Sequence, residues 1–278
     1  MPELPEVEAI KQELAPLLIN KEVKSTWTSN KSLRSQLTDK ERSLLLYKRI
    51  KRVFRRAKFL VIEFESHYLL IHFGMTGRLI TSKIKPDFFI RENKHIHFSF
   101  CTDELFFYFQ DIRRFGALYL YEIKKLKKRL LSHSDSFFGM EPLSLNFTAE
   151  FAYEKTRGVN RTVKSWVMNG PIAGVGNIYT SEALFRAGIN PNLKVKKLGV
   201  TRFSRLVTAI KSVLLDSIRS GGSTIQNFTN IHGDLGEYSN KHLVYGKRSS
   251  KCPICNNLIS LRYISQRSSF YCIKCQKI

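Results

Sequence analysis

The stretch that decides the fold lies near the carboxyl end, where residues 252–275 read CPICNNLISLRYISQRSSFYCIKC. Two close pairs, Cys252/Cys255 and Cys272/Cys275, are separated by 16 residues. This spacing is typical of a structural zinc site in which four thiolates hold one ion tetrahedrally. Disulfide bonds are the alternative use of such pairs, but they are rare inside cells. The sequence therefore predicts one structural Zn²⁺ in a small metal-stabilised domain.

Two short strands are predicted between the cysteine pairs, over 258–264 and 269–272, with residues 265–268 at the tip. A hairpin of this size is not stable alone, so the metal would stabilise it. Arg267 lies at the tip, where a lone cation is usually only solvated; in a basic protein it indicates a phosphate contact. Cys101 has no cysteine nearby and is expected to be a buried, small apolar side chain.

The chain before this domain changes its hydrophobic period once. Period-two alternation with β-branched and aromatic residues predicts an antiparallel sandwich or barrel, with strands at 58–65, 67–73, 95–101, 105–110 and 117–121. Helical periodicity predicts helices near 148–157, 161–169, 177–187 and 201–220. A basic, then serine-rich segment over 124–147 is interpreted as a linker, and 225–240 as a long polar loop. Residues 5–18 form a predicted first helix that Pro16 should end or kink.

The charge indicates the class of partner. Lys and Arg number 46 against 23 Asp and Glu, which gives a formal net charge of +23 spread along the chain. A folded body with this charge is typical of proteins that bind a polyanion such as nucleic acid. An anionic membrane is the competing partner, but no long basic amphipathic helix stands out. Neither a secretion signal nor an apolar run long enough to span a bilayer is visible, so we expect a cytoplasmic protein.

The first eight residues, MPELPEVE, are ambiguous when taken alone. If Met1 is removed, Pro2 becomes a secondary-amine terminus with Glu3 and Glu6 close by. An amine beside carboxylates can perform imine chemistry on an aldehyde-like carbon. The simpler interpretation is an ordinary start in which Pro5 and the glutamates open a helix.

Seven blocks in order resolve that ambiguity, because together they resemble the bacterial formamidopyrimidine-DNA glycosylase family. They are PELPEVE (2–8), RAKFL (56–60), HFGMTG (72–77), DIRRFG (111–116), AGVGNIY (173–179), GGST (221–224) and QR (266–267) within the cysteine hairpin. The resemblance implies an α+β multidomain fold: an N-terminal helix with an antiparallel β-sandwich, a helix–two-turn–helix domain and a four-cysteine zinc-finger hairpin. The expected domains are 1–131, a linker at 132–147, 148–240 and 241–278.

The resemblance implies a bifunctional glycosylase and abasic-site lyase of base excision repair. It would remove 8-oxoguanine and formamidopyrimidines from duplex DNA through an N-terminal proline Schiff base and β,δ-elimination, without an organic cofactor. Two alternatives stay open. One is an oxidised-pyrimidine enzyme similar to endonuclease VIII, disfavoured by Leu4 and by a long loop at 223–238. The other is a non-catalytic DNA-binding relative, disfavoured by Pro2 and its carboxylates. We expect a monomer.

The resemblance also assigns roles by position. Pro2 would be the nucleophile at C1′, Glu3 the general acid and base, and Lys58 a phosphate ligand, while Glu6 would orient these groups. Met75 and Phe115 would fill the space left by the flipped nucleotide, and Arg113 would contact the orphaned cytosine. The expected phosphate contacts are His72, Asn177, Tyr245 and Arg267. The expected lesion-capping loop includes Ser223, Ile225, Gln226, Asn227 and Phe228. Departures from the family pattern are Phe73, Ile112 and Asn169, none of them in the catalytic set.

Overall fold

The computed structural model describes residues 1–84, 86–132, 134–223 and 236–278. The chain divides into two compact units, one made of Met1–Leu131 with Ser220–Glu237 and the other of Ser132–Arg219 with Tyr238–Ile278. The finer boundaries between linker, helical domain and metal-binding domain stay a prediction.

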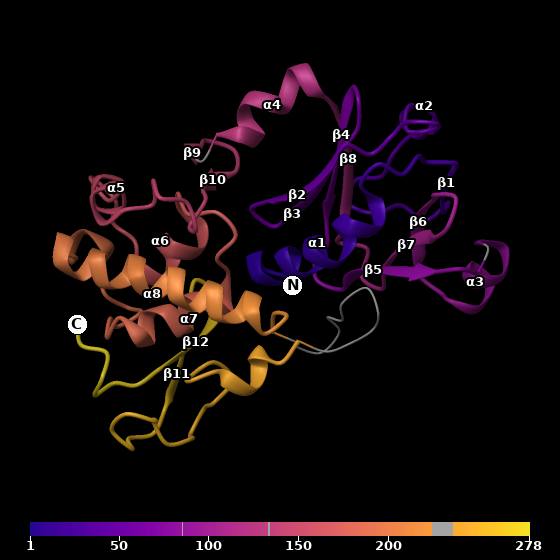
Figure 1. Cartoon of the computed structure of the whole chain (residues 1–278). Helices are drawn as coiled ribbons and strands as arrows, with labels where there is room; N and C mark the ends of the chain where they lie inside the picture. The colour runs from indigo at the N-terminus through magenta and orange to yellow at the C-terminus, as the bar shows by residue number, and fades with distance from the viewer. Residues whose placement is uncertain (85, 133, 224–235) are drawn as a thin grey trace. The chain divides into compact units, whose positions relative to one another are not determined.

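The first unit contains two four-stranded antiparallel sheets, which confirms the predicted sandwich class (Figure 1). One sheet has the order β1 (Ser25–Thr28), β6 (Ile96–Cys101), β7 (Phe106–Asp111) and β5 (Gly77–Ser82). The other has the order β2 (Arg52–Arg56), β3 (Phe59–Glu63), β4 (His67–His72) and β8 (Ala117–Glu122). The strands β1, β2 and β5 were not among those expected from the sequence pattern, because each is only partly buried.

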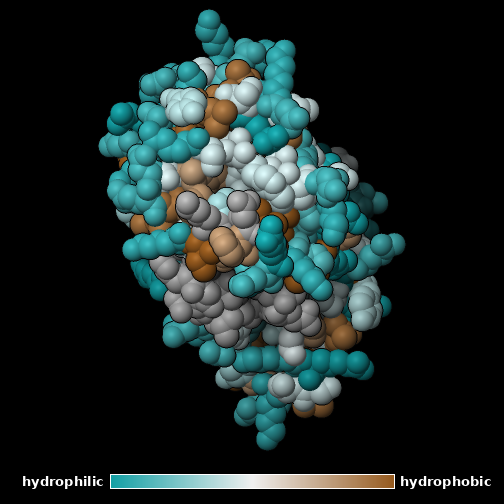
Figure 2. Space-filling view, turned by 90° about the vertical axis from the view of Figure 1, so that its right-hand side faces the viewer, coloured by the Kyte–Doolittle hydropathy of each residue, from teal (hydrophilic) through white to brown (hydrophobic). Residues whose placement is uncertain are grey.

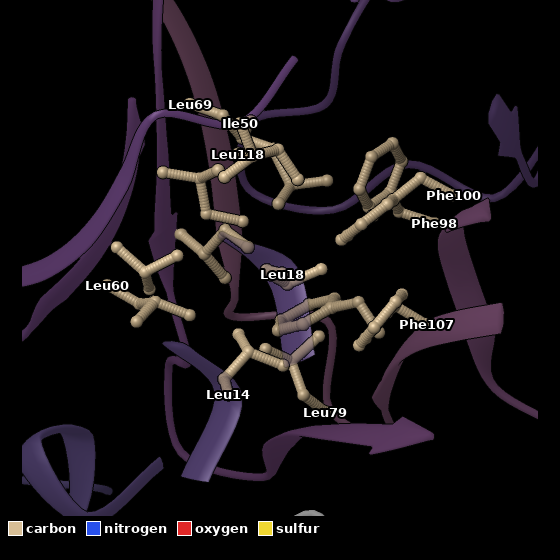
Figure 3. Packing of buried hydrophobic residues seen from close by; sticks show 14 of the residues in the cluster. Leu14, Leu18, Ile50, Leu60, Leu69, Leu79, Phe98, Phe100, Phe107 and Leu118 are labelled. Atoms are coloured by element: carbon tan, nitrogen blue, oxygen red, sulfur yellow. The ribbon is translucent and has the colours of Figure 1, made fainter. Parts of the chain in front are cut away.

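The helix α1 (Leu4–Leu18) packs against β2 and β3 and places one apolar stripe in the core. Figure 3 shows Leu14 and Leu18 of this helix among side chains from both sheets, including Leu60, Leu79 and Phe107. The helix α1 continues past Pro16 and ends at Leu18, so that Pro16 lies in its last turn. Proline removes only its own N–H from the last turn, and the helix still closes through the Ile19 N–H to the Ala15 carbonyl at 3.0 Å.

Three short helices complete the first unit: α2 (Asp39–Ser43), α3 (Pro86–Glu92) and α4 (Ile123–Leu131). The linker expected from residue 124 onward is wrong over 124–131, because this segment is α4. Leu126 and Leu130 lie one helical turn apart and are buried, so the lysine-rich segment has an apolar face that stabilises it as a helix. Side-chain charge alone had favoured a solvated linker.

The second unit is mainly helical, as the periodicity predicted. It contains α5 (Ala149–Glu154), α6 (Val163–Asn169), α7 (Asn177–Arg186) and α8 (Val200–Arg219), together with the short strands β9 (Ser134–Asp135) and β10 (Gly139–Met140) and the 3₁₀ turns η1 (Val195–Lys197) and η2 (Tyr238–Lys241). Trp166 of α6 is buried with its ring centroid 5.5 Å from that of Phe203 in α8. This contact joins two helices of the unit.

The cysteine hairpin consists of β11 (Ser260–Ile264) and β12 (Arg267–Tyr271). Its turn contains two residues, Ser265 and Gln266, with φ of +51° and +58°. Positive φ at both central positions is the geometry of a tight hairpin turn whose twist matches the strands. The four-residue tip expected at 265–268 is therefore corrected, and Arg267 is the first residue of β12, paired with Ile264.

The surface is largely polar on the face that Figure 2 presents, where hydrophobic residues form only small scattered patches. Among the described residues, no helix combines the length and apolar character that crossing a membrane requires.

Candidate active site and metal centre

The amino-terminal segment is buried although it is polar. Pro2 is buried, and Glu3 and Glu6 are 3% and 1% exposed. The two oxygens of Glu6 are both used: Oε2 accepts the backbone N–H of Glu3 at 2.7 Å, and Oε1 accepts that of Ser223 at 2.8 Å. One carboxylate therefore connects the start of α1 to the segment that leads into residue 224.

Gly222 allows this contact. Its φ is +89°, and a Cβ built on it would lie 3.1 Å from both Cγ and Oε1 of Glu6. A side chain at this position would be strained by the backbone and crowded against the carboxylate. The glycine pair at 221–222 thus serves the close approach of the backbone to Glu6.

Strand register gathers the cationic candidates at one end of the second sheet. Lys58 lies in the two-residue turn between β2 and β3, next to Ala57 with φ of +55°. Phe59 pairs with His72, and His72 pairs in turn with Ala117. The turn carrying Lys58, the end of β4 and the residues just before β8 therefore meet at the same edge.

The amino terminus lies within the electrostatic influence of the same groups. Burial is the largest influence on the amine of Met1 and lowers its pKa; Glu3 and Glu6 raise this pKa, and the positive charges of Lys58 and Arg113 lower it. The net direction is downward. A larger share of the amine is therefore unprotonated near neutral pH than in a solvated terminus.

His72 is neutral at this edge. Its burial, together with the positive charges of Lys58 and Arg34, lowers the pKa of the imidazole to about 4. Nδ1 accepts the backbone N–H of Gly74 at 3.1 Å. The remaining proton must then be on Nε2, which makes this atom a hydrogen-bond donor at neutral pH.

Two loops of the first unit carry the exposed candidates. Met75 is 39% exposed in the loop between β4 and β5, and Phe115 is 45% exposed in the loop between β7 and β8. The guanidinium carbon of Arg113 lies 4.8 Å from the centroid of the Phe115 ring. A Cβ built on Gly74 would lie 2.4 Å from the backbone carbon of Phe115, so the two loops are in direct contact.

In the second unit, the start of α7 lies beside the hairpin. Nδ2 of Asn177 donates to Oγ of Ser268 at 3.3 Å, and the buried Oδ1 of Asn177 has no hydrogen-bond partner in the described part of the chain. Arg267, next to Ser268 in β12, is exposed. The structure thus brings the helix start at Asn177 close to the strand that carries Arg267.

Two buried charged residues that the sequence analysis missed hold this region. Nζ of Lys164, 1% exposed, donates to the Ser268 carbonyl at 2.5 Å and to Oγ of Ser269 at 2.6 Å. The fully buried Glu182 accepts the backbone N–H groups of three successive residues, Leu243, Val244 and Tyr245. Both lie on helices with mixed polar and apolar neighbours, where the sequence pattern does not separate a buried charge from a solvated one.

The four cysteines come together as the spacing predicted. Their Sγ atoms all lie within 4.8 Å of one another, with 3.8 Å between Cys252 and Cys275 and 3.4 Å between Cys255 and Cys272. All four are free thiols rather than disulfides. A tetrahedron with metal–sulfur bonds of about 2.3 Å has edges of about 3.8 Å, so the donor set and its size fit one zinc ion.

The surroundings of the thiols shift their pKa values in opposite directions. A backbone N–H of Asn257 lowers the pKa of Cys255 to about 7. Burial raises the pKa of the Cys272 thiol. Because only thiolates bind the metal, loading this site releases protons and weakens in acid.

Part of the expected lesion-capping loop is outside the described residues. This applies to Ile225, Gln226, Asn227 and Phe228. Ser223, which precedes them, is buried and forms an isolated bridge to Glu237.

Comparison with known proteins gives a consistent result over the whole chain. Residues 1–118 match the family model described as the N-terminal domain of formamidopyrimidine-DNA glycosylase, and residues 138–229 match its H2TH domain. Formamidopyrimidine-DNA glycosylase of Ruthia magnifica is 38% identical over 99% of this chain and 100% of its own length. The enzyme of Yersinia enterocolitica is also 38% identical, over 99% and 100%.

Solved structures agree with this result. A complex of a Lactococcus lactis Fpg variant with Fapy-dG-containing DNA superposes with a TM-score of 0.89 at 27% identity, covering 100% of both chains. A complex of the L. lactis protein with abasic-site DNA gives 0.88 at 27% identity, covering 99% of this chain and all of the other. The chain therefore belongs to the formamidopyrimidine-DNA glycosylase family and is a DNA glycosylase.

Proposed function

We propose that this protein is a bifunctional glycosylase and abasic-site lyase that excises 8-oxoguanine and formamidopyrimidines from duplex DNA in base excision repair. The observation that carries the proposal is the buried Pro2 beside the buried carboxylates of Glu3 and Glu6, at a chain start where burial lowers the pKa of the Met1 amine. The relatives solved with Fapy-dG and abasic-site DNA support the same class of substrate.

The proposed reaction begins with the secondary amine of Pro2, exposed once Met1 is removed. The amine attacks C1′ of the damaged nucleotide, the glycosidic bond breaks, and the base leaves with the bonding electron pair and takes up the proton that the amine nitrogen gives up. Glu3 donates a proton to the opening sugar ring, so that an iminium ion forms between Pro2 and C1′. Loss of the C2′ proton then expels the 3′ phosphate, and a second elimination expels the 5′ phosphate.

A terminal amine suits this task better than a lysine. A model α-amine has a pKa of about 8 and a lysine about 10.4, so the terminus has on the order of a hundredfold more free base at neutral pH. In this chain burial and the charges of Lys58 and Arg113 lower the pKa of the Met1 amine, and we expect the same surroundings to act on the Pro2 amine once Met1 is removed. Glu6 is assigned to orienting the segment, since both of its oxygens hold backbone N–H groups.

Duplex DNA is the proposed partner. Lys58 and the Nε2–H of His72 would bind phosphate beside the lesion, and Met75 and Phe115 would enter the stack as the lesion leaves it. Arg113, held over Phe115, would contact the orphaned cytosine. Asn177, Tyr245 and Arg267 of the second unit would bind further phosphates, with the start of α7 supplying backbone N–H groups.

A structural zinc ion would be held by Cys252, Cys255, Cys272 and Cys275, and it would supply the rigidity of the hairpin that carries Arg267. The ion takes no part in the chemical steps. A monomer in the bacterial cytosol, acting on the nucleoid, completes the proposal.

A purine preference is proposed for the lesion. Ser223, tied to Glu6, would anchor a capping loop that continues through Ile225, Gln226, Asn227 and Phe228. The endonuclease VIII type of pyrimidine activity is the alternative; Leu4 and the length of this loop argue against it. A non-catalytic DNA-binding relative is the other alternative. Such a protein has no use for two buried carboxylates beside a terminal amine, because carboxylates would oppose phosphate binding.

Borohydride trapping tests the proposal directly. The protein, with removal of Met1 verified by mass, is incubated with duplexes that carry 8-oxoguanine opposite cytosine, an oxidised pyrimidine, or no lesion. We expect a covalent adduct on the amino-terminal peptide with the 8-oxoguanine duplex. The matched control is the same chain with an uncleaved N-terminal extension, which should give no adduct because its terminus is elsewhere.

Each outcome is informative. Equal trapping with and without the extension would rule out Pro2 as the nucleophile. Trapping that is faster on the oxidised pyrimidine than on 8-oxoguanine would favour the endonuclease VIII type of activity. Tight DNA binding with no adduct on any duplex would favour the non-catalytic alternative.

A further inference from the structure

The buried carboxylate of Asp111 stands at the base of the two loops that carry Met75, Arg113 and Phe115. Asp111 is the last residue of β7 and pairs with Gly77, the first residue of β5. It is 0% exposed, whereas residues 112–115, which follow it, are all exposed. A buried acid without an ion pair normally accepts several hydrogen bonds, and Asp111 does so.

The two carboxylate oxygens of Asp111 connect different loops. Oδ2 accepts the backbone N–H of Gly116 at 2.7 Å, which closes the loop between β7 and β8 on itself. Oδ1 accepts the hydroxyl of Thr76 at 2.5 Å, and Thr76 belongs to the other loop. One side chain therefore ties together segments that lie 35 residues apart.

Thr76 returns the contact. Its Oγ1 accepts the backbone N–H of Arg113 at 3.0 Å while it donates to Asp111. The Arg113 N–H also reaches Oδ1 of Asp111 at 3.3 Å. The Asp111 carboxylate, the Thr76 hydroxyl and the Arg113 N–H form a closed ring of hydrogen bonds. This ring fixes the backbone of Arg113 relative to Thr76, the residue after Met75.

The surroundings leave this ring little freedom. A Cβ on Gly116 would lie 2.7 Å from the Phe109 ring, and the same atom on Gly74 would meet the Phe115 backbone at 2.4 Å. His97, fully buried, has Nε2 3.0 Å from the Asp111 carbonyl. Since a carbonyl only accepts, Nε2 carries the proton and holds the backbone of Asp111 from the other side.

We propose that Asp111 and Thr76 are a positioning pair that makes the two loops one rigid insertion element. The inference rests on the proposed function, because it assumes that Met75, Arg113 and Phe115 enter the DNA stack. Exposed loops of this length are flexible, and ordering them during insertion would cost free energy. The buried ring removes most of that cost before DNA is bound, so the pair acts on lesion extrusion and on reading of the opposite base, through Arg113.

The test compares Thr76→Val with Thr76→Ser, which differ in whether the hydroxyl remains. Single-turnover excision is measured on 8-oxoguanine opposite cytosine and opposite adenine, and cleavage is measured at an abasic site in single-stranded DNA, which needs no insertion. We expect Thr76→Val to lower excision opposite cytosine about tenfold, as expected for losing a buried hydrogen bond to a charged group. The ratio between cytosine and adenine should fall as well, while single-strand cleavage changes by less than about threefold.

Thr76→Ser should restore both excision and the cytosine preference, since the hydroxyl is the group at issue. Asp111→Asn provides the second probe, because its amide cannot accept both the Gly116 N–H and the Thr76 hydroxyl as the carboxylate does. It should give the same pattern as Thr76→Val. Fluorescence of 2-aminopurine placed beside the lesion should report slower unstacking in both variants.

The failures are distinguishable. If Met75→Ala and Phe115→Ala leave duplex excision unchanged, the proposed insertion role is wrong, whatever the ring does. If those variants are slow but Thr76→Val and Asp111→Asn match the wild type in both ratio and unstacking, the positioning pair is wrong. A parallel loss of single-strand cleavage would show a general structural role and would also overturn the inference.

Discussion

The amino-terminal segment and the cysteine hairpin solve the same problem in different ways. Each is a short element that must hold a reactive or charged group in place. The segment before and within α1 is fixed by burial, with Leu4 and Val7 fully buried in the core of the first unit and Glu6 bonded to two backbone N–H groups. The apolar cluster that includes two of the four cysteines as buried members is small, with buried residues Phe185, Val244, Cys252, Ile259 and Cys272.

The difference shows what a large core replaces. A sandwich of two sheets buries enough apolar surface to hold even two carboxylates in position without a cofactor. A hairpin with few buried side chains does not bury enough apolar surface to be stable alone. A metal ion held by four thiolates would supply the missing stability. The two regions should therefore respond differently to metal loss, to removal of one carboxylate and to acid.

The largest effect is expected from the metal site. Cys252→Ser, or treatment with a chelator, should weaken binding of lesion-containing duplex on the order of 100-fold, about 2.7 kcal/mol. The hairpin would lose the proposed metal, and Arg267 with the other proposed phosphate contacts nearby would lose their geometry. Fluorescence anisotropy of labelled DNA at fixed salt measures this change.

Tryptophan fluorescence tests, within one molecule, whether the first unit is unaffected by metal removal. The chain has two tryptophans, Trp27 in the first unit and Trp166 in the second. In a Trp166→Phe background, Trp27 alone reports the first unit, and its emission should not change when the metal is removed. A shift of Trp27 emission on chelation would contradict the view that the sandwich stands without metal.

A smaller effect is expected from Glu6→Gln. The amide can accept only one of the two backbone N–H groups that Glu6 holds, and its own NH₂ would face the other. An unsatisfied buried donor costs about 1–3 kcal/mol. We expect trapping by borohydride to slow about tenfold and the urea midpoint of the first unit to fall, while zinc content stays unchanged. Exposed Glu65→Gln is the matched control and should alter neither; a normal trapping rate in Glu6→Gln would remove this residue from the active site.

The last prediction concerns acid stability rather than an affinity or a rate. His72 has a folded-state pKa of about 4, below its usual 6.5, so its contribution to stability is fully present above pH 6.5 and is lost as pH falls toward 4. The full loss is about 3 kcal/mol, of which only part is reached at pH 4.5. Urea unfolding at pH 7 and pH 4.5 should therefore show a smaller drop for His72→Gln than for the wild type.

The exposed His95 supplies the control, because His95→Asn keeps a residue that tolerates its φ of +72°. His97 and His242 also have lowered pKa values through burial, so only the difference between His72→Gln and the wild type isolates His72. If the stability of His72→Gln and of the wild type fell in parallel from pH 7 to pH 4.5, this result would contradict the neutral state assigned to the His72 imidazole.

Much of the fold followed from the pattern of residues, and the misses share a cause. The sequence shows the apolar stripe of α1 because one side of this helix is buried, and it shows β4 because the central apolar run of this strand is buried throughout. α4 was missed because five basic residues conceal the two buried leucines, Leu126 and Leu130, and the strands β1, β2 and β5 because they are only partly buried. The hairpin turn was placed two residues too wide because Ser265 and Gln266 carry no glycine signal for their positive φ.

The candidate site divides in the same way. Local spacing determined the metal ligands, since a chelating pair needs its two thiols within one turn of chain. The net charge indicated the class of partner. The order of the motifs along the chain indicated the family.

Only the tertiary structure decided which buried polar groups connect distant segments. The links from Glu6 to Ser223, from Asp111 to Thr76, and from Lys164 to Ser269 join residues that are 217, 35 and 105 positions apart. A hydrogen bond across such a distance leaves no periodic trace, because it depends on the register of strands and the packing of helices rather than on neighbouring residues. The sequence indicated the residues that contact DNA in the proposed function. Only the fold identified the buried residues that position them.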